Sequence, residues 1–72
     1  MKVTILGNHL RAKRSEKGLT QQKLADKLGW SLRKLTTYER NERIPPLTEA
    51  LLLAEALETT VEQLWAYGVR KE

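Results

Sequence analysis

Four side chains near the middle of the chain could contact the edges of DNA bases: Leu32, Arg33, Thr36 and Thr37. An arginine guanidinium can donate two parallel hydrogen bonds to O6 and N7 of guanine, so we expect Arg33 to make the main base contact. The threonines offer hydroxyl groups to base edges or methyl groups to thymine, and Leu32 suits contact with a thymine methyl. The alternative for Leu32 is that it packs beside Trp30.

A second group of side chains, around the first, could contact phosphates. Some lie at the expected start of a helix, where free N–H groups and the positive end of the helix dipole attract anions. Others lie beside the expected reading helix or in the loop after it, where guanidinium groups suit phosphate contact, or minor-groove entry for Arg43. The alternative is that they are ordinary exposed side chains. The candidates are Gln21, Gln22, Lys23, Lys34, Arg40 and Arg43.

The charges are unevenly distributed along the chain, whose net charge is +4. Residues 1–43 hold eleven Lys and Arg against four Asp and Glu, a net charge of +7. Residues 44–72 hold two against five, a net charge of −3. The basic part contains the candidate residues, as a phosphate-binding surface requires. The alternative is that the lysines only solvate a small helical domain.

The elements that position these residues are predicted to be two short helices, at about residues 21–28 and 32–40. Thr20 and Ser31 are N-cap candidates, because each hydroxyl can accept a hydrogen bond from the first turn. Gly29 follows the first helix where a positive φ is needed at little cost. Because about one residue separates the helices, their axes must cross steeply. This pattern predicts a helix-turn-helix, whose second helix lies in the major groove.

The N-terminal residues are predicted to differ in structure before and after residue 6. Residues 1–5 are β-prone, but we expect a frayed end; a strand at a dimer contact and packing along the core are the alternatives. A helix is expected from about residue 6 to 17, with Arg14 on its apolar stripe. A buried cation needs a partner, and we expect Glu39, on the inner face of the second corner helix, to form a structural ion pair with it.

The C-terminal residues predict two more helices, at about 48–57 and 61–66. The first is so densely apolar that we expect it to form the floor of the core. Gly68 is expected to stop the last helix before a polar tail. The domain then spans residues 6–67, with an extension at 1–5 and a tail at 68–72. Exposed apolar residues on the last helix would be dimer anchors, although completing the core is the alternative; the candidates are Val61, Trp65 and Tyr67.

Much of the chain resembles the lambda-repressor-like (Cro/XRE-type) helix-turn-helix family, over about residues 6–66. The resemblance rests on Arg14, Leu19-Thr20-Gln21, Leu24-Ala25, Leu28-Gly29, Ser31, Leu35, Glu39, Pro45, Leu53-Ala54 and Leu57. It implies an all-α fold, a compact five-helix domain with the DNA-binding corner in its second and third helices. It also implies symmetric homodimers on operator-like sites, often as regulators of phages, plasmids or mobile elements. By position it implies base contacts from Leu32, Arg33, Thr36 and Thr37, a phosphate or outer-base contact from Gln21, and backbone contacts from Arg40, Asn41 and Arg43.

The resemblance has departures. Asn41 replaces the usual glycine after the third helix, and Glu58 lies where glycine usually ends the fourth, which predicts mild strain or an altered turn. Trp30 is large for the turn. Tyr38 replaces an aliphatic core residue, so its hydroxyl must find a partner or reach solvent.

We therefore expect sequence-specific binding of double-stranded DNA by a small dimeric transcriptional regulator, a repressor by the family resemblance. The alternative function is that of an antitoxin or adaptor whose main role is to bind a partner protein. We expect no enzyme activity, because no nucleophile–base pair, phosphate loop or paired-acid cleft is suggested. The absence of cysteine excludes disulfides and thiolate metal sites, and we expect no metal or cofactor. No apolar run approaches a membrane span, so we expect a cytoplasmic, nucleoid-associated protein of a bacterial or phage host cell.

Overall fold

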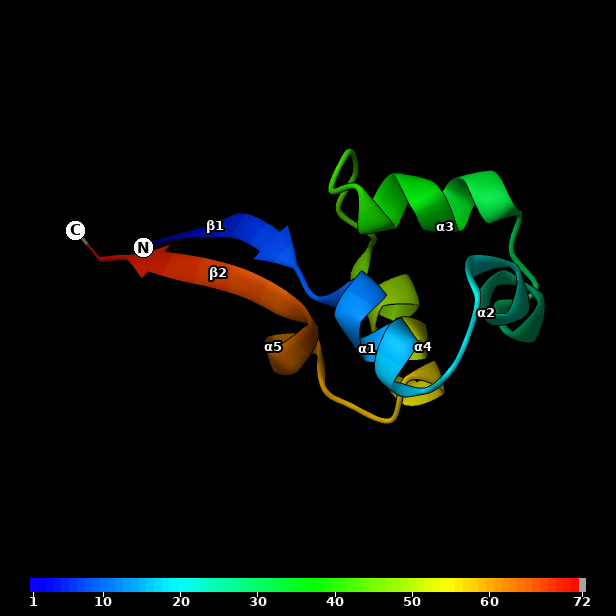
Figure 1. The fold of residues 1–72 in the computed structure, drawn as a ribbon. Helices are drawn as coiled ribbons and strands as arrows, with labels where there is room; N and C mark the ends of the chain where they lie inside the picture. The colour runs from blue at the N-terminus through cyan, green and yellow to red at the C-terminus, as the bar shows by residue number, and fades with distance from the viewer. Residues whose placement is uncertain (72) are drawn as a thin grey trace.

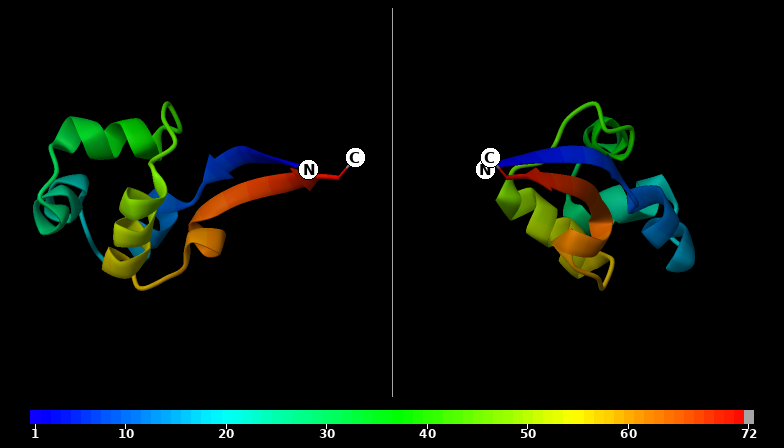
Figure 2. Two further views of the ribbon diagram at one scale, coloured as in Figure 1. Left: turned by 180° about the vertical axis from the view of Figure 1, so that it is seen from behind. Right: turned by 90° about the vertical axis from the view of Figure 1, so that its left-hand side faces the viewer.

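The computed structural model describes residues 1–71 and contains five helices and two strands. In chain order these are β1 (Lys2–Asn8), α1 (Leu10–Glu16), α2 (Gln21–Leu28), α3 (Leu32–Glu39), α4 (Leu47–Ala56), α5 (Val61–Leu64) and β2 (Trp65–Arg70). The helices form one body, and the two strands lie side by side and project from it, with the start of β1 and the end of β2 at the far end (Figures 1 and 2). We call the paired strands, residues 2–8 and 65–70, the arm. None of the helices in the described part of the chain is long and apolar enough to cross a membrane.

The arm corrects the expectation of an all-α fold. β1 and β2 form an antiparallel two-stranded sheet in which Val3 pairs with Val69 and Ile5 with Tyr67. The register shifts between Ile5 and Gly7, a bulge that leaves one extra residue in β1. Residues 2–5 are therefore not frayed, and residues 68–70 are not a loose tail. Glu72, the end of the expected tail, lies outside the described residues.

Two helix boundaries also differ from those expected. α1 begins at Leu10 instead of residue 6, because residues 2–8 are extended and Leu6 is an exposed strand residue. α5 ends at Leu64 instead of residue 66, and Gly68 lies within β2 and stops no helix. In β2, aromatic and β-branched residues alternate with smaller or polar ones, a pattern of period two that favours a strand once a partner is available.

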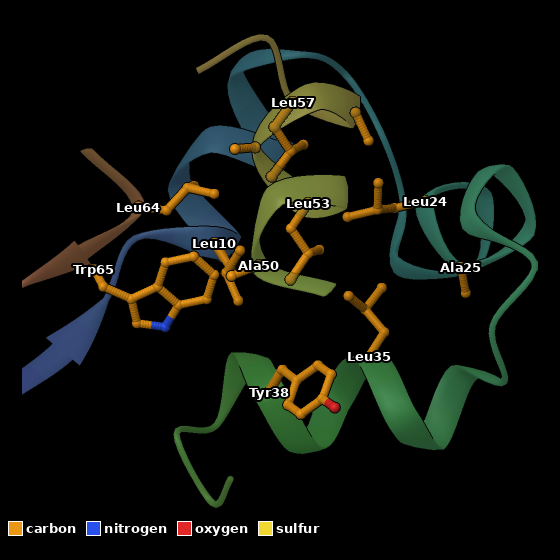
Figure 3. Packing of buried hydrophobic residues seen from close by; sticks show 12 residues of the cluster. Leu10, Leu24, Ala25, Leu35, Tyr38, Ala50, Leu53, Leu57, Leu64 and Trp65 are labelled. Carbon is orange, nitrogen blue, oxygen red and sulfur yellow. The ribbon is translucent and has the colours of Figure 1, made fainter. Parts of the chain in front are cut away.

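The core lies between the helices and the base of the arm (Figure 3). Its fully buried leucines come from α1, α2, α3, α4 and the residues that follow α4, and Tyr38 and Trp65 are also buried. Only one side of α4 belongs to this core. Ala50, Leu53, Ala54 and Ala56 are buried there, so α4 contributes to the core as expected, whereas Leu47, Leu51 and Leu52 are exposed on its other side.

Candidate nucleic-acid interface

The corner between α2 and α3 is built by local hydrogen bonds. The Thr20 hydroxyl accepts a bond from the Lys23 N–H at 3.1 Å, and the Ser31 hydroxyl accepts one from the Lys34 N–H at 3.2 Å. Gly29 ends α2 with a φ of 72°, which an L side chain rarely adopts. These caps satisfy one backbone donor at the start of each helix, as predicted.

The structure places the four expected base-contact residues on α3, with its buried residues Leu35 and Tyr38 turned to the core. Leu32 and Arg33 are exposed in the first turn of α3. Thr36 and Thr37 are half-buried, and each hydroxyl donates to the Arg33 carbonyl, at 3.0 and 2.8 Å. Because these protons are already used, the threonines can offer base edges acceptor oxygens and methyl groups, but not donors.

The expected phosphate-contact residues divide into two groups. Three have side chains engaged within the chain: Gln21 donates to Glu39, Gln22 donates to Asp26, and Lys34 pairs with Glu49. Lys34 also lies over the Trp30 ring, 4.6 Å from its centroid. The other group is exposed and forms no side-chain hydrogen bond or ion pair within residues 1–71; its members are Lys23, Arg40, Asn41 and Arg43.

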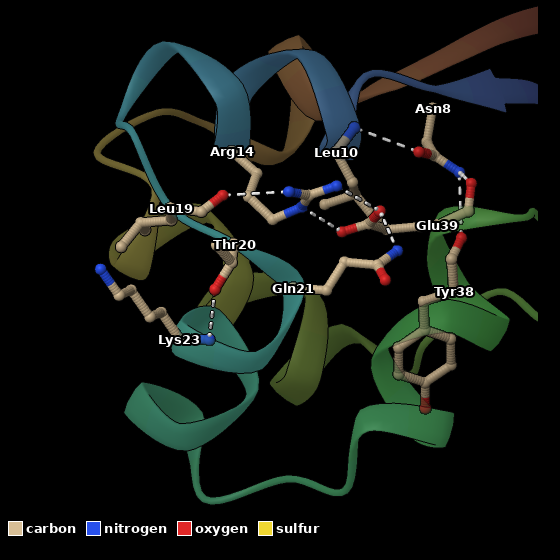
Figure 4. A network of polar contacts seen from close by, with 9 residues as sticks. All are labelled: Asn8, Leu10, Arg14, Leu19, Thr20, Gln21, Lys23, Tyr38 and Glu39. Atoms are coloured by element: carbon tan, nitrogen blue, oxygen red, sulfur yellow. Dashed lines mark hydrogen bonds and ion pairs between the residues drawn. The ribbon is translucent and has the colours of Figure 1, made fainter.

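A nearly buried ion pair holds α3 against α1 (Figure 4). Arg14 donates from Nε to Glu39 Oε2 at 2.8 Å and from Nη2 to Glu39 Oε1 at 3.2 Å. Its Nη1 donates to the Leu19 carbonyl at 3.0 Å, and Glu39 Oε1 also accepts from Gln21 at 3.1 Å. The two charged side chains are only 12% and 5% exposed. The predicted ion pair is therefore present, and with Gln21 it joins α1, α3 and the first turn of α2.

Sequence reasoning missed the role of Asn8 in this network (Figure 4). Its side-chain amide donates to the carbonyls of Tyr38 and Glu39, at 3.0 and 3.3 Å, and its oxygen accepts from the Leu10 N–H at 3.1 Å. Asn8 thus accepts from the first backbone N–H of α1, from the position before the N-cap residue His9, and ties the end of β1 to the end of α3. Because the sequence pattern placed Asn8 inside a helix, these contacts were not predicted.

A surface hollow of about 530 Å³ lies next to this network and is lined by Arg11, Arg14, Thr20, Gln21, Glu39 and Arg40. Arg14 and Glu39 neutralise each other, whereas Arg11 and Arg40 are exposed cations without an ion-pair partner in residues 1–71. The hollow adjoins the start of α2, whose unpaired N–H groups favour anions. Its charge and position suit a backbone phosphate, and Arg11 is a candidate contact residue that the sequence did not indicate.

Comparison with known proteins identifies the fold family. A family model described as helix-turn-helix matches residues 10–64, well over half of the chain. The chain belongs to the Cro/C1-type helix-turn-helix family. The match ends just inside the two strands, so the arm lies outside it. No curated protein matches the chain.

A solved structure supports the same assignment. The crystal structure of a candidate DNA-binding protein from Bacteroides fragilis is similar to this chain, with a TM-score of 0.76 and 25% sequence identity. The similarity covers 90% of this chain and 100% of that chain. It therefore extends beyond the helix-turn-helix corner to most of the fold.

Tyr38, the large departure in the helix-turn-helix core, finds a partner for its hydroxyl. It donates to Glu49 Oε1 at 2.5 Å, and its ring meets that of Trp30 edge-on, with centroids 5.8 Å apart. The hydrogen bond to Glu49 raises the pKa of Tyr38. Hydrogen bonds from Lys34 and then from Tyr38 lower the pKa of Glu49. This cluster fastens α3 to α4, as the Arg14–Glu39 pair fastens α3 to α1.

Two of the other departures, Asn41 and Glu58, have a positive φ, as at the glycines they replace. Asn41 and Glu58 have φ angles of 59° and 55°, in the left-handed region where glycine is most common. Asn41 tolerates this conformation better than most residues, whereas Glu58 is strained.

The expected dimer contacts differ in exposure. Trp65 is 5% exposed and completes the core, so it is not available as a surface anchor. Val61 is partly buried against the core, and Tyr67 is 47% exposed on the arm.

Proposed function

We propose that this chain binds double-stranded DNA sequence-specifically and acts as a small dimeric transcriptional regulator. The observation that carries the proposal is the outer side of α3. Arg33 is exposed there and unpaired within residues 1–71, while the inner side of the same helix is fixed to α1 and α4. A helix held in this way can enter the major groove without reorganising, so little binding energy is lost in ordering it.

Phosphate contacts would position this helix on the duplex. Four exposed cations surround this helix. Lys23 lies in the first turn of α2, Arg11 lies on α1 beside the hollow, and Arg40 and Arg43 follow α3. Contacts to phosphate set orientation and register but carry no sequence information. Sequence preference would then come mainly from Arg33, with smaller contributions from Leu32 and the two threonines.

One observation supports the alternative function, in which the main role of the chain is to bind a partner protein. Several large apolar residues are exposed, including Val3, Ile44, Leu47 and Tyr67. Such a surface could bind a different protein, as an antitoxin or adaptor would require. We place DNA binding first because the exposed cations and the exposed side of α3 occur together on the helix-turn-helix corner. We propose no enzyme activity.

The first test is selection of bound duplexes from a random DNA pool, followed by affinity measurements at two salt concentrations. We expect a palindromic motif whose half-sites are about 34 Å apart. Salt-steep binding without a motif would leave only a basic surface and would contradict sequence-specific regulation.

A matched pair of variants then distinguishes a residue that recognises a base from one that contacts phosphate. Arg33→Ala should weaken binding to the selected site by about 1–3 kcal/mol, about 5- to 150-fold, and relax one base preference. Lys23→Ala is the control: it should weaken binding equally on all sequences and reduce the salt slope by about 1. If Arg33→Ala also weakened random and selected DNA equally, Arg33 would be a phosphate contact only.

A further inference from the structure

The arm has one apolar and one polar face. Residues paired across an antiparallel sheet point to the same side, so Val3 and Val69 share a face with Ile5 and Tyr67. The opposite face carries the pair Lys2–Arg70 and the pair Thr4–Gly68.

The apolar face of the arm is incompletely covered. Val3, Tyr67 and Val69 are 60%, 47% and 45% exposed. A two-stranded sheet is marginally stable in water unless its apolar face is packed against something. The arm projects from the helices (Figures 1 and 2), and the exposure of these three residues shows that the rest of the chain leaves its apolar face partly uncovered.

An apolar groove of about 360 Å³ continues from this face onto the helical body. It is lined on the body side by Ile44, Pro45, Leu47 and Val61. A second hollow that shares Leu47 and Val61 extends it to Leu51. Ile44, Leu47 and Leu51 are exposed, so the molecule presents an apolar ridge, the arm, beside an apolar groove.

The charges around the ridge and the groove are complementary. Residues 44–66 contain four glutamates and no lysine or arginine, and Glu62 borders both hollows. The arm carries Lys2 and Arg70 and no acid. Among residues 1–71, neither of these cations forms an ion pair. A basic arm end and an acidic groove edge that do not pair within one chain can pair between two.

We propose that a second copy of this chain docks here, with the arm of each copy lying along the groove of the other. A two-fold axis requires a self-complementary surface, and a ridge beside a matching groove satisfies this requirement. Complete burial of an aliphatic side chain removes roughly 60–120 Å². The exposed parts of Val3, Val69, Ile44, Leu47, Leu51 and Tyr67 thus supply a few hundred of the ~800 Å² that each partner contributes to a standard interface.

This surface deepens the proposed function, on whose dimer it rests, and it is compatible with DNA binding. The arm lies beyond the C-terminal end of α3 and leaves the outer side of that helix uncovered (Figure 1). The chain is 42 Å long, with the arm forming one end. Two copies joined through their arms would have to present their α3 helices to successive major grooves, about 34 Å apart.

The test is sedimentation equilibrium of the full chain without DNA, at up to several hundred micromolar. We expect a dimer for wild type. Val69→Asp, on the apolar face, should raise the dimer dissociation constant at least tenfold, and Leu52→Asp, at an exposed leucine of α4 that lines neither hollow, should leave it nearly unchanged. Circular dichroism checks that both variants remain folded. A wild type that stays monomeric, or a folded Val69→Asp variant that dimerises like wild type, would overturn the inference.

A charge exchange tests the arrangement of arm on groove. Lys2→Glu with Arg70→Glu should weaken the dimer severalfold, and adding Glu62→Lys should recover much of the loss. A triple variant no tighter than the double variant would overturn this arrangement.

Binding to a half-site duplex separates failure of this inference from failure of the proposed function. A monomeric Val69→Asp variant that still binds the half-site supports both. A wild-type dimer that binds no DNA would contradict the proposed function and leave the dimer surface standing. A wild type that is monomeric and binds DNA would overturn the dimer surface and leave DNA binding standing.

Discussion

Removing Glu39 should destabilise the fold far more than removing an ordinary surface charge. Glu39→Ala leaves the Arg14 guanidinium, 12% exposed, without a counter-ion, although its Nη1 keeps the bond to the Leu19 carbonyl. Breaking a buried ion pair by deleting one partner costs about 3–5 kcal/mol. Because that one bond remains, we expect the lower end, about 3 kcal/mol.

This loss is large for so small a protein. At about 0.05–0.15 kcal/mol per residue, a domain of this length has roughly 4–11 kcal/mol of stability in total. One kcal/mol shifts the melting temperature of a 60–100-residue domain by about 4–8 °C, so Glu39→Ala should melt about 12–24 °C below wild type. The assay is thermal and urea unfolding followed by circular dichroism.

Two further variants make the test specific. Glu16→Ala removes the exposed partner of Lys13 in an ion pair between residues three apart on α1. This variant should change stability by less than about 0.5 kcal/mol. Arg14→Met combined with Glu39→Leu removes both charges and should recover most of the stability lost in Glu39→Ala. If Glu39→Ala melted within two degrees of wild type, the pair would contribute little, and our account of how α3 is held would be wrong.

Two other perturbations act on α4 and on the turn that follows it. The lowered pKa of Glu49, due first to Lys34 and then to Tyr38, means that its carboxylate stabilises the folded state above its ordinary pKa. This contribution is lost as pH falls through the lowered pKa, so the stability difference between wild type and Glu49→Gln, from urea unfolding, should shrink between pH 7 and pH 3. A constant difference would contradict the linkage. Glu58→Gly should relieve the strain of a φ of 55° and raise stability by about 0.5–1 kcal/mol in the same assay; a lower melting temperature would show that the turn is not strained.

The contacts of the helix-turn-helix corner could be predicted because they are local. The hydroxyls of Thr20 and Ser31 each accept a hydrogen bond from the N–H three residues later, and Gly29 adopts a positive φ at the end of α2. The Arg14–Glu39 pair, although 25 residues apart, also followed from pattern, because a cation and an acid on two apolar stripes of a small core have few other partners.

The contacts that side chains of the candidate site make within the chain could not be predicted. Whether the amide of Gln21 faces solvent or Glu39, and whether Lys34 faces solvent or Glu49, depends on which elements pack beside them. The sequence marks both residues only as polar and near a helix start or flank. Their contacts are properties of the assembled core.

By itself the sequence determined the helix-turn-helix corner, the side of α3 that faces outward and the charge asymmetry between the two parts of the chain. The tertiary structure alone decided the arm. A helix satisfies its backbone hydrogen bonds within four residues, so its signals are present in any short stretch. A strand satisfies them only with a partner, and here Val3 finds Val69 at the other end of the chain. The β-prone residues at 2–5 and the alternation at 65–70 acquire their structure only when the folded helices bring the two ends together.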